Sequence, residues 1–207
     1  KLSDKTSELF PDSFEDSKLG KIPTSWSTCC LKELGNWSEG KTWKKEFRIE
    51  SSDIPVFGAN GIVGYSSTAL SEGRVLFVGK IGTCGAINSF NGKFWASNNT
   101  FFLEEKNNPH LEFIRGIIER INFSQYIGGS SNPYMPLKNF GGHMVVIPPK
   151  YLMEYFCHNL LPLRKRIENL TKESFLLLSL RNLILPKLIS GELKISDAEK
   201  MIEEVGI

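Results

Sequence analysis

The sequence predicts an α+β protein in which a β-rich domain precedes one long helix. In the middle of the chain, short apolar runs alternate with glycine, asparagine and proline, a pattern typical of strands joined by tight turns. Beyond Lys150 the apolar residues recur instead at alternating spacings of four and three, the pattern of a helix that pairs with another helix. With 41% hydrophobic residues among 207, the chain can bury a core.

The chain is expected to divide into four segments. Residues 1–18 are polar and mixed in charge, which predicts a linker or arm. Residues 19–149 form the β-rich domain and residues 150–190 the long helix. Residues 191–207 are expected to form a tail with a short acidic helix, capped by Ser196 and Glu199.

Two dipeptides in the β-rich domain predict tight hairpin turns. Asn60-Gly61 and Asn91-Gly92 both suit the positive φ angles that two-residue hairpin loops require. Each lies between two apolar runs, so each is expected to join two strands. The expected strands are residues 54–57, 62–65, 74–78, 85–90, 93–96, 100–103 and 143–147.

A shorter helix is expected near Asn108-Pro109. Asparagine can cap the free amides of a first helical turn, and proline suits the first helical position. The apolar residues that follow fall on one helical face: Leu111, Ile114, Ile118 and Ile121.

The long helix carries an apolar stripe that it cannot bury against itself. We expect it to be kinked or broken at Pro162 and to end at Pro186 and Gly191. Its stripe predicts a partner helix, and a second copy of the chain would supply one. The residues assigned to this dimerisation seam are Leu163, Ile167, Leu170, Leu177, Ile184 and Leu188.

Positive charge is concentrated although the formal net charge is only +2. Residues 150–194 hold eight lysines and arginines against four acidic residues, and residues 36–93 hold seven against five. A near-neutral total does not exclude nucleic acid, because the distribution of charge decides. The long helix and the β-rich middle are therefore the candidate basic surfaces.

Three groups of side chains could contact DNA, by phosphate contacts or by reading base edges. The first is a basic patch interleaved with Trp43 and Phe47; the alternative is a solvated loop face. The second is a lysine between glycines, for which an ordinary turn is the alternative. The third is a polar loop after Gly128-Gly129, which could equally have no role. The candidate residues are Lys41, Lys44, Lys45, Lys80, Ser130, Ser131, Asn132 and Tyr134.

The sequence predicts no catalytic centre, cofactor or metal site. Residues 131–134, Ser-Asn-Pro-Tyr, are similar to the [DNS]-P-P-[YFW] loop of amino-methyltransferases. Asn132 replaces the first proline, however, and the chain has neither their cofactor loop nor a phosphate-binding loop for ATP. The four cysteines lack metal-ligand spacing, so free thiols in a reducing cytoplasm are expected: Cys29, Cys30, Cys84 and Cys157. No apolar run predicts a membrane span or signal peptide.

Several motifs resemble the specificity subunits of type I restriction–modification systems. Residues 19–26, Leu-Gly-Lys-Ile-Pro-Thr-Ser-Trp, resemble the family's Gly-x-Ile-Pro-x-x-Trp motif, which opens a target recognition domain. Residues 9–14 are similar to its linker, and residues 128–149 to its closing segment. The most specific resemblance is residues 180–193, which are similar to its terminal conserved helix. The departures are the variable middle, residues 36–107, and the absence of Glu-Gln after Pro148-Pro149.

The resemblance implies a sequence-specific DNA-binding subunit without catalysis. In this family two recognition domains, separated by two antiparallel helices, each read half of a bipartite double-stranded DNA target. The helices also dock the methyltransferase (modification) subunits, and the restriction subunit carries translocation and cleavage. One domain with one helix implies half a subunit or one half of a homodimer. The first residue, Lys1, is not methionine, which leaves open that an N-terminal part is missing.

Two rival interpretations stay open at this point. One is a small DNA amino-methyltransferase built around residues 131–134. The other is a coiled-coil adaptor whose β-rich domain binds protein. The DNA target itself cannot be read from the variable middle of the sequence.

Overall fold

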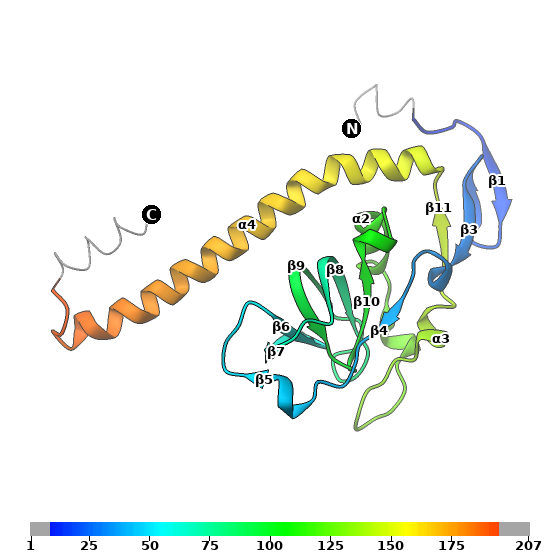
Figure 1. Ribbon diagram of the computed structural model, residues 1–207. Coiled ribbons are helices and arrows are strands. Elements are labelled where there is room, and N and C mark those ends of the chain that lie inside the picture. The colour runs from blue at the N-terminus through cyan, green and yellow to red at the C-terminus, as the bar shows by residue number, and fades with distance from the viewer. Residues whose placement is uncertain (1–8, 195–207) are drawn as a thin grey trace. The chain divides into compact units, whose positions relative to one another are not determined.

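A computed structural model describes residues 9–194 and confirms the predicted α+β class. A β-rich domain is followed by one long helix (Figure 1). Its largest sheet has seven strands in the order β4-β10-β8-β9-β6-β7-β5. These strands are β4 (Ser38–Glu39), β5 (Arg48–Ile49), β6 (Pro55–Gly58), β7 (Gly61–Ser66), β8 (Ser71–Gly79), β9 (Ile87–Ala96) and β10 (Thr100–Glu104).

Both faces of this sheet are buried at its centre. Along β8, Val75 and Phe77 enter one hydrophobic cluster, whereas Leu76 and Val78 enter another. Successive side chains of a strand point to opposite faces, so a strand covered on both sides is apolar at every position. This explains the continuous apolar run of residues 75–78, and β8 confirms the strand predicted over residues 74–78.

Short elements cover the rest of the domain. The strands β1 (Phe14–Ser17) and β2 (Gly20–Pro23) form a hairpin, and β3 (Ser27–Cys30) pairs with β11 (Met144–Ile147). The helices are α2 (Leu111–Ile118), α3 (Leu137–Phe140) and the 3-10 turns η1 (Leu31–Glu33), η2 (Lys45–Phe47), η3 (Glu105–Asn107) and η4 (Phe123–Tyr126).

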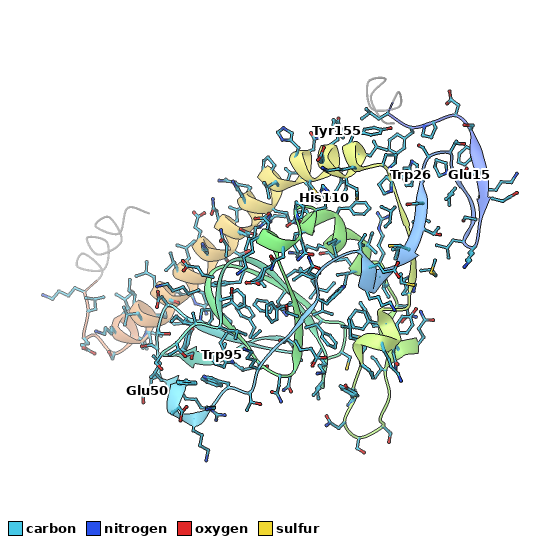
Figure 2. The ribbon with its side chains drawn as sticks, turned by 45° about the vertical axis from the view of Figure 1, so that its right-hand side comes forward. Glu15, Trp26, Glu50, Trp95, His110 and Tyr155 are labelled. Carbon is cyan, nitrogen blue, oxygen red and sulfur yellow. The ribbon has the colours of Figure 1, made fainter. Side chains whose placement is uncertain are left out.

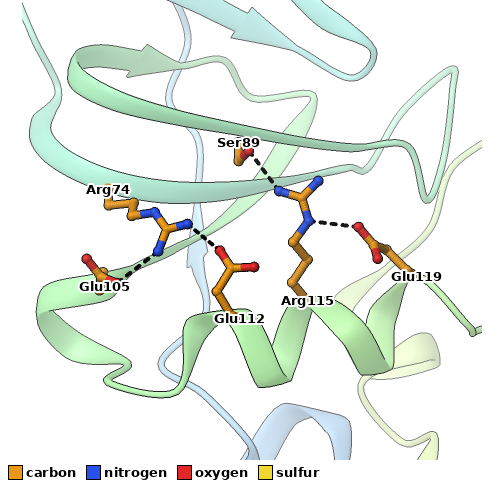
Figure 3. A network of polar contacts seen from close by, with 6 residues as sticks. All are labelled: Arg74, Ser89, Glu105, Glu112, Arg115 and Glu119. Carbon is orange, nitrogen blue, oxygen red and sulfur yellow. Dashed lines mark hydrogen bonds and ion pairs between the residues drawn. The ribbon is translucent and has the colours of Figure 1, made fainter. Parts of the chain in front are cut away.

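A network of charged side chains fixes α2 against the sheet (Figure 3). The guanidinium of Arg74, on β8, pairs with Glu105 at 3.2 Å and also with Glu112 on α2. One turn further along α2, Arg115 donates to Glu119 (2.7 Å) and to Ser89 on β9 (2.8 Å). The Arg74 and Glu112 side chains are buried, so each supplies the countercharge that the other needs away from water.

The hairpin expected at Asn91-Gly92 is wrong. Residues 87–96 form one continuous strand, β9, in which Gly92 lies opposite Gly73 of β8. Gly92 has φ +145°, and a Cβ there would approach Phe90 Cε1 to 3.1 Å. Gly92 thus leaves room for the Phe90 ring within a continuous strand. The connection between β8 and β9 lies instead at residues 80–86.

Two other local predictions need correction. The β6–β7 hairpin is confirmed, but its register pairs Gly58 with Gly61, so the loop residues are Ala59 and Asn60. The helix expected near Asn108-Pro109 begins only at Leu111. Asn108 does not cap it, because its buried side chain accepts from the Asn36 amide (2.7 Å) and donates to the Glu104 carbonyl (2.8 Å).

The arm expected over residues 1–18 contains structure near its end. Phe14–Ser17 forms β1, which pairs with β2 through the register Ser17 to Gly20. The backbone of Ser13 also accepts a hydrogen bond from Thr24. The domain therefore takes in residues that precede the expected boundary at residue 19.

The long helix α4 (Lys150–Ile189) matches the predicted span of 150–190 to within one residue. Pro162 and Pro186 both lie inside it, so the expected stop at Pro186 is wrong, and the chain leaves the helix just before Gly191. Within residues 9–194, no helix is both long and apolar enough to cross a membrane. The short helix expected around Ser196 and Glu199 lies outside the described residues.

The described chain divides after His158 into two compact units. The first turns of α4 belong to the β-rich unit, since Phe156 contacts Phe113 of α2 edge to face (ring centroids 6.0 Å) and Leu152 is buried. The sequence placed this boundary at residue 149. The two boundaries differ because the apolar periodicity of α4 is the same along its length and does not indicate which turns pack on α2.

Candidate nucleic-acid interface

A tightly closed loop carries four of the predicted DNA-contacting residues. Gly128 and Tyr134 exchange two backbone hydrogen bonds, of 2.8 and 2.9 Å, which close the base of the loop. Gly129 has φ +81°, and a Cβ there would lie 2.7 Å from the Asn132 carbonyl oxygen, so the turn requires glycine. Ser130, Ser131 and Asn132 at its tip are exposed. In Figure 1 the loop between η4 and α3 projects from the domain.

The loop is held on the turn that follows β8. Met135 donates to the Lys80 carbonyl (2.9 Å), and Gly82 donates to the Pro133 carbonyl (2.8 Å), on either side of a bridge between Ile81 and Tyr134. Two segments far apart in the sequence thus form one short ladder. Sequence reasoning chose residues from both segments but did not predict that they pair.

Lys80 lies at the junction of these two segments. Its side chain is only 12% exposed, and its ammonium donates to Glu39 Oε2 at 2.7 Å. The same nitrogen lies 5.2 Å from the ring centroid of Phe101 and 5.8 Å from that of Tyr134. The Glu39 partner was not singled out from the sequence, because a lone acidic residue in a variable region carries no pattern.

The basic segment before β5 has a different environment. Lys41, Lys44 and Lys45 are all exposed. Among them, Lys44 pairs with Glu46 at 3.5 Å, with both side chains well exposed, so this pair adds little stability. Arg48 stacks on Trp43, 4.7 Å from the ring centroid, and donates to the Trp43 carbonyl. Arg48 is thus a further cation beside these lysines, held on the Trp43 ring.

One turn, between β9 and β10, connects the basic segment to the loop. Lys41 donates its amide to the Ala96 carbonyl and pairs with Ser97, whereas Lys80 donates its amide to the Asn99 carbonyl (2.7 Å). Lys41 and Lys80 therefore flank the same few residues. Lys44 and Lys45 lie further along, where Phe47 packs on Trp95. Figure 2 places Trp95 at the end of the domain that carries Glu50, and Trp26 and Glu15 at the other.

The predicted seam residues lie on α4 as expected, but their exposure differs. Leu163, Ile167, Leu170 and Leu177 are exposed, Leu163 to 60%. Ile184 is 7% exposed and Leu188 is half-buried. Further exposed apolar residues were not assigned to the seam. They are Leu176, Leu178, Leu183, Leu185 and Ile189.

Three thiols of the described chain do not suggest nucleophiles. Burial raises the pKa of Cys29, Cys84 and Cys157, which favours the protonated and unreactive form at neutral pH. Cys84 donates its proton to the Lys80 carbonyl (3.1 Å). Among residues 9–194 no three histidine, cysteine or acidic side chains gather in a way that could hold a metal ion.

Fold and surface together define a class of protein: a β-rich module with an exposed polar loop and lysines, followed by a helix whose apolar side chains are exposed. The chain belongs to a known family of such modules. The model of the family described as "Type I restriction modification DNA specificity domain" matches residues 23–151, more than half of the chain.

Curated relatives agree with this assignment. The chain is 26% identical, over 89% of its length, to 48% of the type I restriction enzyme MjaIX specificity subunit of Methanocaldococcus jannaschii. It is 28% identical, over 42% of its length, to 22% of the EcoprrI specificity subunit of Escherichia coli. It therefore spans half of these relatives or less.

In fold, the chain is similar to the type I restriction–modification S subunit of M. genitalium. The TM-score is 0.64 at 16% identity, over 80% of this chain and 46% of the other. A likeness at this identity concerns the fold alone, and it agrees with a β-rich domain followed by a long helix.

Proposed function

We propose that this chain recognises one half of a bipartite DNA target for a type I restriction–modification enzyme, in the cytoplasm and without catalysing a reaction itself. The single observation that carries the proposal is the closed loop of residues 128–135, whose exposed polar tip is held on the turn after β8, near the exposed Lys41. Hydrogen-bonding side chains on a fixed loop suit base edges, and lysines suit phosphates.

Two kinds of contact follow from the positions of the candidate residues. Lys41, Lys44 and Lys45 are exposed cations, so we assign them to phosphates. The tip residues Ser130, Ser131 and Asn132, with Tyr134 at 40% exposure, are the candidates for reading bases. Lys41 lies beside the β9–β10 turn, to which Lys80 also bonds, which supports an interface that includes both Lys41 and the loop.

The long helix supports the second part of the proposal, which concerns assembly. Leu163, Ile167, Leu170 and Leu177 recur at helical spacing on one face and are exposed. Leu176 and Leu183, seven residues apart, are exposed on another face. Exposed apolar stripes mark contact surfaces. We assign the first stripe to an antiparallel homodimer, and the methyltransferase and restriction subunits to further docking on the assembled complex.

A homodimer has a consequence for the DNA target. Isologous pairing of two identical chains is two-fold symmetric, so it presents the same reading domain twice. The bipartite target would then be a palindrome interrupted by a spacer. A chain that pairs instead with a second, different domain would read an asymmetric target.

Binding measurements on the full chain, together with the methyltransferase subunit of its own system, test the proposal. Duplexes selected from a random library are compared with random duplexes over a range of salt concentrations. Asn132→Ala is expected to lose preference for the selected duplex, by about 1–3 kcal/mol if its side chain reads a base. Lys44→Ala is expected to weaken both duplexes alike and to lower the salt slope by roughly one.

The matched control is Lys21→Ala, an exposed lysine on β2 that lies opposite Asp16 of β1. Figure 2 shows Glu15, the neighbour of Asp16, at the other end of the domain from Trp95. It should bind like the wild type. If the wild-type complex shows no preference for any duplex, the proposed function is wrong. If the purified chain alone transfers labelled methyl groups to DNA, the amino-methyltransferase interpretation replaces it.

A further inference from the structure

The environment of Lys80 does not suit a phosphate contact. A lysine that neutralises a DNA phosphate must present its ammonium to solvent, but this side chain is 12% exposed and its nitrogen is already paired with Glu39 Oε2 at 2.7 Å. Glu39 itself is 57% exposed and lies on the edge strand β4, opposite Phe101. The charge of Lys80 is therefore already paired with a carboxylate of the same domain.

The main chain of Lys80 is held from three sides. Its amide donates to the Asn99 carbonyl at 2.7 Å, and its own carbonyl accepts from the Met135 amide and from the Cys84 thiol. Met135 is fully buried in the core cluster that also contains Phe101. Lys80 thus connects the β9–β10 turn to Met135, at the end of the exposed loop.

The side chain of Lys80 adds a contact to the loop itself. Its ammonium lies 5.8 Å from the ring centroid of Tyr134, within the range of a cation–π interaction. Tyr134 closes the loop through its two hydrogen bonds with Gly128. Pairing with Glu39 keeps the ammonium in this place, because both Glu39 and Phe101 belong to the sheet.

We propose that Lys80 is a positioning residue, which with Glu39 fixes the orientation of the loop of residues 128–135 and so sets DNA sequence discrimination without contacting a phosphate. This inference rests on the proposed function. It replaces the phosphate contact that the sequence suggested for this lysine, and it adds Glu39 to the residues on which specificity depends.

The test uses Lys80→Met, which keeps the length of the side chain and removes its charge, and Glu39→Gln, which removes the ion pair and leaves the lysine. Both are assayed in the full chain with its methyltransferase subunit. We expect Lys80→Met to reduce preference for the selected duplex roughly tenfold, the scale of one base contact. Its binding to random DNA and its salt slope should match the wild type. Glu39→Gln should change discrimination in the same direction by a smaller factor.

Lys41→Ala is the matched control, since Lys41 flanks the same β9–β10 turn but is exposed. It should lower the salt slope by roughly one on both duplexes. If Lys80→Met does the same, Lys80 is a phosphate contact and the inference is wrong. A Lys80→Met variant that folds and binds both duplexes like the wild type overturns it as well.

Hydrogen exchange on the free chain gives a readout that needs no DNA. Lys80→Met and Glu39→Gln should both speed exchange of the Gly128 and Tyr134 amides, while amides in β8 and β9 stay protected. If wild-type binding shows no sequence preference but exchange changes in this way, the proposed function fails and the positioning role stands. Unchanged exchange at both amides in both variants contradicts the positioning role, whatever the DNA result.

Discussion

The β-rich domain and the helix beyond His158 use apolar residues in opposite ways. In the domain, Phe77 and Phe101 are exposed to 1% or less, and each packs on other aromatic rings. On the helix, Leu163 is exposed to 60%. The domain therefore contains its own core, whereas Leu163, Ile167, Leu170 and Leu177 of the assigned seam are exposed. The difference teaches that the domain buries its apolar residues within itself, whereas the exposed residues of the helix suit the partner helix that we propose.

The largest contrast is expected for truncation of apolar side chains. Phe77→Ala should lower the free energy of unfolding by about 3–5 kcal/mol, because it removes a ring that stacks on Phe57 (centroids 4.2 Å apart) and leaves a cavity. Leu163→Ala should change it by less than about 0.5 kcal/mol under conditions where the chain is monomeric. Urea unfolding followed by tryptophan fluorescence measures both. Equal losses would contradict the comparison.

Removing an ion pair should likewise cost more stability in the domain than on the helix, with a smaller difference than for the apolar side chains. Arg74→Met leaves the carboxylate of Glu112, which is 5% exposed, without this partner in the interior. Removing one partner of a buried pair costs about 3–5 kcal/mol, and we expect the lower end because Met fills part of the space. Lys187→Met, which breaks an exposed pair with Glu192 on the helix side, should cost about 0–1 kcal/mol. Thermal and urea unfolding measure the loss of stability in each variant, and equal losses would contradict the contrast.

The helix should respond strongly only when its association is measured. Leu170→Asp and Leu177→Asp each place a charge in the proposed seam, so we expect the dissociation constant of the homodimer to rise roughly 100-fold. Asn169→Asp, an exposed polar position off that stripe, is the control and should leave association unchanged. Sedimentation equilibrium measures all three. A wild-type chain that is monomeric at micromolar concentration would contradict the homodimer assignment.

Much of the fold follows from the sequence wherever a pattern is repeated. The apolar run of residues 75–78 and the spacing along α4 each involve several residues that agree, so one misread position does not change the predicted element. Single dipeptides proved weaker. Asn91-Gly92 reads as a hairpin turn, but the aromatic ring of Phe90 and the opposite glycine, Gly73, favour a continuous strand.

The candidate site was predictable in composition but not in arrangement. The polar loop and the lysines could be chosen because their residue types suit DNA. The pairing of Lys80 with Glu39 depends on β4 lying beside β10, a contact between residues 41 positions apart that no local pattern encodes. The same limit applies to Asn108, whose amide suits a helix cap but instead bonds to Asn36, 72 positions away.

The smallest expected effect is a change in the salt dependence of DNA binding. It shows which of the two regions contacts the DNA backbone. Both carry positive charge, and residues 150–194 carry more of it than residues 36–93. Charge alone would therefore place the DNA on the helix. We expect it on the domain, because the exposed Lys41 lies beside the turn that also anchors the polar loop, whereas Lys172 on the helix lies among exposed leucines assigned to assembly.

Salt dependence separates these two alternatives without knowledge of the target sequence. Each phosphate contact that is lost reduces the slope of log binding constant against log salt concentration by about 0.9. Lys41→Ala should show this reduction, and Lys172→Ala should retain the wild-type slope, with unfolding free energies equal to the wild type in both. The measurement is fluorescence anisotropy of a labelled random duplex titrated with the assembled complex between about 50 and 200 mM salt. A reduced slope in Lys172→Ala alone would move the phosphate contacts to the helix, and the division of labour between the two regions would then be reversed.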